Sequence, residues 1–170
     1  MEYKVSKEGI ILIHHFESCS LRPYQKKGDR PTIGWGNTFY EHGTPVKMTD
    51  KIITQERADK LFYNILSGFE KDVNYLIKPA EKPLTQGMYN GILAFAYNAG
   101  TDIDADAIPE GLGDSTLLKK VLANCEDFVA IEKEFMKWIS KGSAFEKGLT
   151  RRRKSEFYMY KTGKLRFFLD

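Results

Sequence analysis

The sequence has few cysteines, no long apolar run and no export signal, and each shortage excludes a class of protein. Cys19 and Cys125 are the only cysteines among 170 residues, which excludes a disulfide framework and fits no metal-ligand spacing. No run of about 18 apolar residues occurs, so we expect no membrane-spanning segment. The N-terminus has an apolar core of only Ile10 to Ile13 and lacks a small-residue cleavage site. We therefore expect a chain made in the cytoplasm without a signal peptide.

An excess of charge of one sign is also missing. Lys and Arg total 26 and Asp and Glu 23, a formal net charge of +3. This mild excess suits an anionic polymer without requiring one. A nucleic-acid binder would show a concentrated basic face, whereas the run Arg151–Arg153 would fan out around a helix, so we expect no nucleic-acid partner. The hydrophobic fraction of 42%, with 13% aromatics, is enough for a core and excludes disorder.

The chain has the length of one domain, residues 1–170, of mostly helical α+β class. Residues 20–50 predict short strands, because glycine and proline punctuate aromatic and β-branched residues there. We expect a small β-containing lobe at about 1–53, a long connecting helix at about 54–77 and a helical lobe at about 84–170, with a ligand cleft between the lobes. The helices expected in the last lobe cover residues 84–99, 115–123, 126–140 and 148–161.

Glu17 is the first candidate for chemistry. Ser6 can cap a first helix, in which Ile10, Ile13, His14 and Glu17 follow the i, i+3, i+4, i+7 spacing of one face. A carboxylate on an apolar face is unfavourable unless it is paired or functional. The spacing therefore leaves two interpretations, a buried ion pair with an arginine or a catalytic acid.

We expect no metal site. The neighbouring His14 and His15 point to different sides of a helix and cannot easily share one ion. The acidic loop 101–114 begins like a calcium-binding loop, but Ala107 replaces the glycine expected at its sixth position and Gly113 the glutamate expected at its twelfth. A solvated acidic loop at the rim of the cleft is the better interpretation.

Five motifs in order resemble phage-type lysozymes, glycoside hydrolase family twenty-four. In "FES…LRPY…PTIGWGNT", Tyr24 and Thr32 follow Glu17 by seven and fifteen residues, as in the family signature. The resemblance continues through nearly the whole chain in "LTQGMYNGILAFAYNAG" (84–100), "STLLKKV" (115–121), "FMKWISKG" (135–142) and "GLTRRRKSE" (148–156).

The resemblance implies a lysozyme-like fold and a bacteriolytic endolysin of a phage or prophage. Such an enzyme hydrolyses the β-1,4 bond between N-acetylmuramic acid and N-acetylglucosamine in bacterial peptidoglycan with inversion, without a cofactor. It would act as a monomer and reach the cell wall through holin-type release or lysis. Glu17 would be the general acid, Thr32 would place the attacking water, and Arg152 would orient Glu17 while Glu156 pairs with an arginine one turn away.

The resemblance also implies that Tyr97, Asn98 and Thr116 line the sugar-binding cleft. Ordinary helix packing would explain these positions as well, above all that of Tyr97.

One catalytic position departs from the family. Cleaving a glycosidic bond needs a proton donor and a second group that acts as base or nucleophile. The family has Asp or Cys nine residues after the acid, but here Lys26 stands there, and a lysine cannot serve as that carboxylate. The nearest acid is Asp29, in KKGDRP. Asp29 either replaces the missing group or only caps a turn built around Gly28.

This departure leaves two other functions open. A lytic transglycosylase can work with a single acid, because the C6 hydroxyl of muramic acid displaces the leaving group and no base for water is needed. A non-catalytic wall-binding protein can keep the fold without the chemistry.

Overall fold

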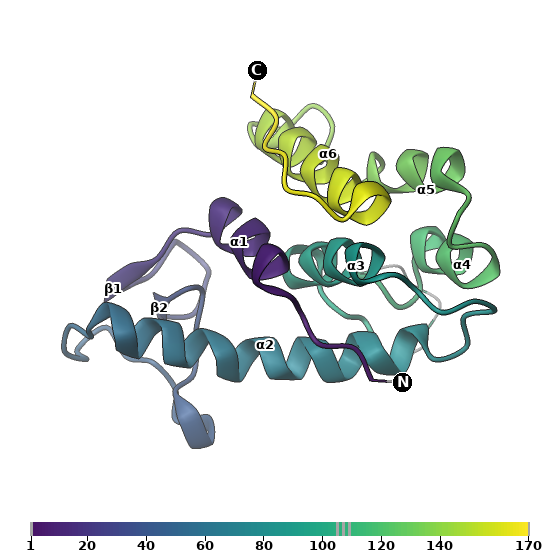
Figure 1. Ribbon diagram of the computed structural model, residues 1–170. Coiled ribbons are helices and arrows are strands. Elements are labelled where there is room, and N and C mark those ends of the chain that lie inside the picture. Colours follow the sequence, from purple (N-terminus) through teal and green to yellow (C-terminus); the bar gives the residue numbers. More distant parts are fainter. Residues whose placement is uncertain (1, 105, 107, 109, 170) are drawn as a thin grey trace. The chain divides into compact units, whose positions relative to one another are not determined.

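The computed structural model describes residues 2–104, 106, 108 and 110–169, which are mostly helical with one small sheet (Figure 1). Their order is α1 (Lys7–Phe16), β1 (Ser20–Tyr24), β2 (Thr32–Gly34), the 3-10 helix η1 (Glu41–Gly43), α2 (Gln55–Ile77), α3 (Gln86–Ala99), α4 (Thr116–Ala123), α5 (Phe128–Phe135) and α6 (Glu146–Thr162). The expected mostly helical α+β class is confirmed. Among the described helices, none is both long and apolar enough to cross a membrane.

The residues cluster into two compact units. One comprises residues 14–68, and the other comprises residues 1–13 together with residues 69–170. The chain passes from one unit to the other inside α1 and again inside α2. The predicted lobes at 1–53 and 84–170 and the cleft between them stay predictions.

The unit of residues 14–68 is organised by a glycine-rich hairpin. Strands β1 and β2 pair antiparallel, and Ile33 and Asn37 exchange two main-chain hydrogen bonds of 2.9 Å just after β2. The tight turn between them needs Gly34 and Gly36, whose φ angles of +63° and +101° favour glycine. The buried Asn37 side chain donates to the Leu61 carbonyl oxygen at 3.1 Å and fixes the turn against α2. The motif "TIGWGNT" is thus a folding motif as well as a signature.

The other unit is built around α3. Residues 87–96 of this helix are all buried, and Thr85 caps its start by accepting the Met88 N–H at 3.2 Å. Gly87 and Gly91 allow α6 to approach closely. A Cβ on Gly87 would lie 2.6 Å from the Cα of Gly163, and a Cβ on Gly91 would lie 2.7 Å from the carbonyl oxygen of Glu156. Only glycine fits this contact without displacing main chain.

Most helix boundaries lie within two residues of the expectations, and the largest difference is at the end of α5. Helix α5 ends at Phe135, not at residue 140, because the chain turns through Ser140 and Gly142, whose φ angles are +48° and +81°. This turn lets the Trp138 ring meet Phe95 edge-on at 5.2 Å. Helix α6 begins at Glu146, two residues earlier than expected. The other helices start or end within two residues of their predicted bounds.

Candidate active site

Glu17 lies directly after the last residue of α1. The helix ends at Phe16, so Glu17 begins the link to β1 and does not continue the helical face as the spacing predicted. The apolar side of α1 is nevertheless real, because Leu12 and Ile13 are buried. Glu17 itself is half-buried. The end of a packed helix therefore fixes the position of this carboxylate.

Thr32 begins β2, and its β-sheet partner is Tyr24, the last residue of β1. The hydroxyl of Thr32 donates a hydrogen bond to the Arg30 carbonyl oxygen at 2.9 Å. A hydroxyl that donates once keeps two lone pairs that can accept. Thr32 can therefore still accept a hydrogen bond from a water molecule at this end of the hairpin.

Asp29 lies in the turn that joins the two strands. Its N–H donates to the Lys26 carbonyl oxygen at 3.0 Å, and Gln25 Nε2 donates to its carbonyl oxygen at 2.7 Å. Gly28 takes a φ angle of +90°, as the third residue of a type II turn requires. These bonds use the main chain of Asp29, and its carboxylate makes no hydrogen bond to the described residues. Lys26, at the position of the family's second carboxylate, is exposed.

Tyr24 brings the two carboxylates into one electrostatic environment. Burial raises the pKa of the Tyr24 phenol, and the negative charges of Glu17 and Asp29 raise it further. Both carboxylates therefore act on the same phenol, and Thr32 is the sheet partner of that tyrosine.

A ring stack supports the end of α1. The His14 ring lies parallel to Trp35, with a centroid distance of 3.8 Å and an interplanar angle of 2°, and meets Phe62 edge-on at 4.3 Å. Trp35 Nε1 donates to Asp59 Oδ1 at 2.7 Å. His14 Nε2 is buried and makes no hydrogen bond to the described residues. Burial lowers the His14 pKa, and the charge of Asp59 opposes that shift.

Arg152 lies in the other unit, on α6. Its Nε donates to Glu156 Oε1 at 2.9 Å, and its Nη2 donates to the Ala94 carbonyl oxygen at 3.4 Å. Arg153 Nε also lies 3.0 Å from Glu156 Oε2, so Glu156 pairs with two arginines and not with the single one expected. Glu156 is 1% exposed, Arg152 5% and Arg153 0%. The predicted action of Arg152 on Glu17 stays a prediction.

The three predicted sugar-binding residues have local partners in the helical unit. The ring of Tyr97 packs against Phe69 at 4.9 Å. Asn98 is exposed, and its Oδ1 accepts a hydrogen bond from Nη2 of the buried Arg153. Thr116 donates its hydroxyl proton to the Glu134 carboxylate. Buried arginine and glutamate side chains thus hold the two polar members of the set.

A cavity of about 470 Å³ opens beside Asn98, and the sequence reasoning missed most of its lining. Trp138 supplies an aromatic ring to it and Lys137 an ammonium group. Lys137 also donates a hydrogen bond to Glu134 at 2.8 Å. Glu134 therefore binds both Thr116 and a residue that lines the cavity. Burial opposes ionisation of Glu134, but Lys137 and Thr116 together lower its pKa. Lys137 and Trp138 both lie in the motif "FMKWISKG". An aromatic residue next to a lysine, shortly before a turn, could have indicated this part of the site.

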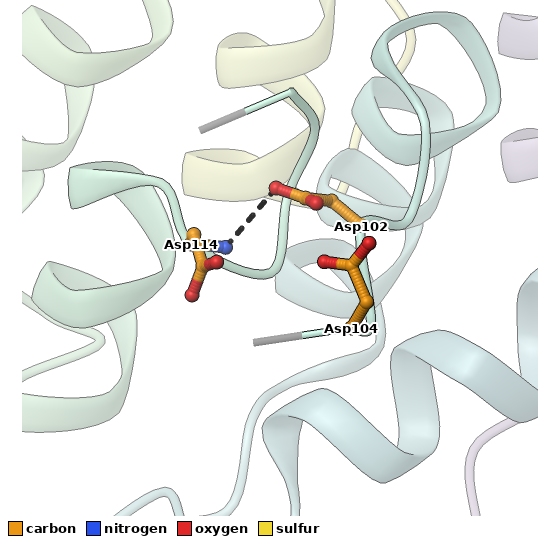
Figure 2. A group of neighbouring side chains, drawn as sticks. All are labelled: Asp102, Asp104 and Asp114. Atoms are coloured by element: carbon orange, nitrogen blue, oxygen red, sulfur yellow. Dashed lines mark hydrogen bonds between the residues drawn. The ribbon is translucent and has the colours of Figure 1, made fainter. Parts of the chain in front are cut away.

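The acidic loop brings three carboxylates together. One oxygen each from Asp102, Asp104 and Asp114 lies within 4.8 Å of the others (Figure 2). Asp102 Oδ2 already accepts the N–H groups of Glu110 and Gly111 at 3.1 Å and of Asp114 at 3.4 Å. These main-chain donors explain the inward position of Asp102 without an ion, and the expectation of no metal site stays a prediction.

A close contact explains why residue 113 of this loop is a glycine. A Cβ on Gly113 would lie 1.5 Å from the carbonyl oxygen of Asp102, so a larger residue does not fit. Ala107, the sixth position in the calcium-loop comparison, lies outside the described residues. Gly113, at the twelfth position of the calcium-loop comparison, is therefore required by packing and offers no side-chain ligand for an ion.

Comparison with known proteins identifies the family of this chain. The model of the phage lysozyme family matches residues 14–156. The chain belongs to the phage lysozyme family. The endolysin of Acyrthosiphon pisum secondary endosymbiont phage 1 is 31% identical to it over 163 residues, which cover 93% of this chain and 98% of that relative. The endolysin of Bacillus phage B103 is 30% identical over 94% of this chain but only 54% of that relative, so the chain spans about half the length of this longer protein.

Solved structures show the same phage lysozyme fold. The endolysin from Escherichia coli O157:H7 phage FAHEc1 superposes with a TM-score of 0.77 at 27% identity and covers 98% of both chains. The muramidase domain of SpmX from Asticaccaulis excentricus gives 0.72 at 27% identity, covering 94% of this chain and 99% of that one. The family predicted from five sequence motifs is confirmed. The matched phage lysozyme segment includes all the predicted site residues from Glu17 to Arg152.

Proposed function

We propose that this chain is a muramidase that hydrolyses the β-1,4 bond between N-acetylmuramic acid and N-acetylglucosamine in bacterial peptidoglycan, and so acts in cell lysis. Family membership supports the enzyme class and the substrate. The observations that support the chemistry are the half-buried Glu17 after α1 and the exposed Asp29 in the hairpin turn, whose charges both raise the pKa of Tyr24. Glycosidases that use water need such a pair.

Glu17 is the general acid in this proposal. It protonates the glycosidic oxygen as the bond to the anomeric carbon breaks, so the leaving sugar departs as a neutral alcohol. Its half-buried place at the end of a packed helix supports the role, because a proton donor must be held at a fixed distance from the leaving oxygen.

Asp29 and Thr32 handle the attacking water. Thr32 can accept one proton of the water in a hydrogen bond, since its own proton is committed to Arg30. The Asp29 carboxylate takes the other proton as the water oxygen attacks the anomeric carbon from the face opposite the leaving group. Attack from that face inverts the configuration. Asp29 is exposed, and the hydrogen bonds at this turn use its main chain and not its carboxylate, which supports this assignment over a turn-capping role.

The sugar-binding role extends to the helical unit. We assign Asn98 to a polar contact with the glycan, together with Lys137 and Trp138 from the cavity beside it. An aromatic ring with neighbouring amide and ammonium donors suits a sugar, which has both apolar C–H faces and hydroxyl acceptors. Thr116 and Tyr97 then act on the neighbouring surface, and both are already held by Glu134 and Phe69.

The transglycosylase and the non-catalytic wall binder are not favoured, since the relatives are named endolysins and a muramidase domain. Product analysis separates all three. Purified peptidoglycan is digested, and the soluble fragments are identified by mass spectrometry before and after borohydride reduction. Muramic acid at a reducible end is the expected product. Anhydro-muramic ends would instead identify a transglycosylase, and wall binding without soluble fragments would identify a non-catalytic protein.

A further inference from the structure

The charges of this chain are distributed unevenly along the sequence. Residues 137–170 hold 10 of the 26 Lys and Arg residues but only 3 of the 23 Asp and Glu residues. Their formal charge is therefore 10 minus 3, or +7, and residues 1–136 carry the remaining −4 of the net +3. Such an asymmetry indicates a local surface that attracts anions, although the whole chain is nearly neutral.

Helix α6 divides its cations between two faces. Arg152 and Arg153 are buried and neutralised by Glu156. Lys147, Arg151 and Lys154 follow the i, i+4, i+7 spacing of a different face. Lys147 and Lys154 are exposed and Arg151 is half-buried. These three residues, here called the α6 cation row, follow one another about 4.5–6 Å apart along the helix axis.

The cation row lines a groove. A hollow of about 640 Å³ is bounded by the three cations of the row, by Glu146, the one carboxylate among its described lining residues, and by Leu169 from the C-terminal tail. Glu146 is itself engaged, since its Oε2 accepts the Gly142 N–H at 2.6 Å. The C-terminal tail runs back along α6 (Figure 1), and Leu169 of this tail lines the hollow. The lining of the groove is therefore mainly positive.

A second hollow continues the row toward the end of α6. It has a volume of about 340 Å³ and shares Lys154 with the groove. Lys161 adds a further cation, Glu132 adds a carboxylate, and Tyr158 and Phe168 supply aromatic walls. The guanidinium of Arg166 lies 5.5 Å from the Tyr158 ring and 4.6 Å from the Phe168 ring, so the tail is held in place by cation–π contacts.

We propose that this groove binds a linear, phosphate-bearing polymer, separately from the glycan that the enzyme cleaves. Cations that succeed one another along a groove match the regular charges of a polyanion strand, and Lys and Arg are the usual phosphate ligands. A bilayer surface is the alternative anion, and exposed Phe145 and Leu169 would suit it. A bilayer surface fits a convex face better than a groove, however, and here the cations lie in the hollow. The polymer is therefore the better match.

The test measures binding of the full chain to fluorescently labelled long-chain inorganic polyphosphate, with poly-glutamate as a carboxylate polymer for comparison. We expect binding to polyphosphate that weakens as NaCl is added and that exceeds binding to poly-glutamate. The combined substitution K147E/R151E/K154E should raise the Kd at least about tenfold. Cleavage of bare peptidoglycan should stay at the wild-type rate, because none of the three residues belongs to the proposed catalytic group.

The matched control is K51E/K71E/K119E, which makes the same change in net charge at three exposed lysines in other parts of the chain. Equal losses in both triple variants would mean that only net charge matters and would overturn the proposal. Capture by phosphatidylglycerol vesicles without binding to polyphosphate would overturn it in favour of a membrane. If the charge reversal unfolds the chain, K147Q/K154Q replaces it, and unchanged polyphosphate affinity in that variant would also refute the groove.

Discussion

The two compact units use buried and exposed carboxylates for opposite purposes. In the unit of residues 1–13 and 69–170, Glu156 is 1% exposed and pairs with two guanidinium groups. In the unit of residues 14–68, Asp29 is exposed in a turn that is closed by a main-chain hydrogen bond, and Glu17 directly follows the last residue of α1. A buried glutamate held by two cations stabilises a helix contact, whereas a carboxylate that must exchange a proton has to meet substrate and water. The comparison predicts that activity and stability are separable by unit.

The largest expected effect is on catalysis, from Glu17→Gln. The amide keeps the shape of the side chain but has no acidic proton to give, so cleavage of purified peptidoglycan should fall about 10²–10⁴-fold. The thermal midpoint should stay close to that of the wild type, since the helix end remains packed. Turbidity loss and a melting curve on the same preparation measure both. Near-wild-type cleavage would remove Glu17 from the mechanism.

The second prediction concerns the water-activating base in the same hairpin. Asp29→Asn should reduce cleavage by about 10²-fold or more, because no other carboxylate is assigned to accept the proton of the water. Lys26→Asp should change the rate little if Asp29 already acts as base. Initial rates of the two variants on one peptidoglycan preparation decide the point. A higher rate in Lys26→Asp with a harmless Asp29→Asn would instead place the missing base at position 26.

Arg152→Ala should reduce stability rather than chemistry in the helical unit. The change removes a buried partner of Glu156 and of the Ala94 carbonyl, and we expect a loss of about 1–3 kcal/mol in the free energy of unfolding. Arg151→Ala is the matched control, because Arg151 is the preceding arginine of the same helix and is half-buried, whereas Arg152 is buried. Urea titrations compare the two variants. Equal midpoints would show that the buried network does not depend on Arg152.

The smallest predicted effect is the pH dependence contributed by His14. Burial lowers its pKa in the folded chain below the unfolded value of about 6.5, although the Asp59 charge opposes the shift. The unfolded chain therefore binds the extra proton first, and stability should fall as pH drops from about 6.5 toward the lowered folded pKa. Above about pH 6.5 this contribution is constant. His14→Phe keeps a ring for the Trp35 stack and should flatten the melting temperature in that range. An unchanged pH profile would contradict the assignment.

Local signals predicted much of the fold. Glycine and proline punctuation of residues 20–50 predicted short strands there, and apolar periodicity predicted α2 almost to the residue, because turns and helix faces are encoded by neighbouring residues. The end of α5 was wrong, since the turn through Ser140 depends on where Trp138 packs. The contacts of Thr116 with Glu134 and of Gly91 with α6 join segments far apart in the chain. No local pattern encodes such contacts.

The sequence likewise predicted one part of the candidate site and not the other. Motif spacing pointed to Glu17 and Thr32, because their spacing of fifteen residues matches the family signature that the sequence resembles. It could not decide between the interpretations of Asp29, since the direction of a turn carboxylate depends on the main-chain bonds that close the turn. The sequence predicted one arginine partner for Glu156, but the structure has two. The arginines three and four residues before Glu156 both reach its carboxylate.

The all-round burial of α3 has a consequence for how the chain opens. A helix with one exposed face can lose its hydrogen bonds turn by turn, but residues 87–96 have no exposed position. Gly87 and Gly91 also place the main chain of α6 directly against it. Amide protons in this segment can therefore exchange with solvent only when the whole helical unit comes apart. Their exchange rates would report the global unfolding equilibrium, while those of the turn at Gly28 would report local motion alone.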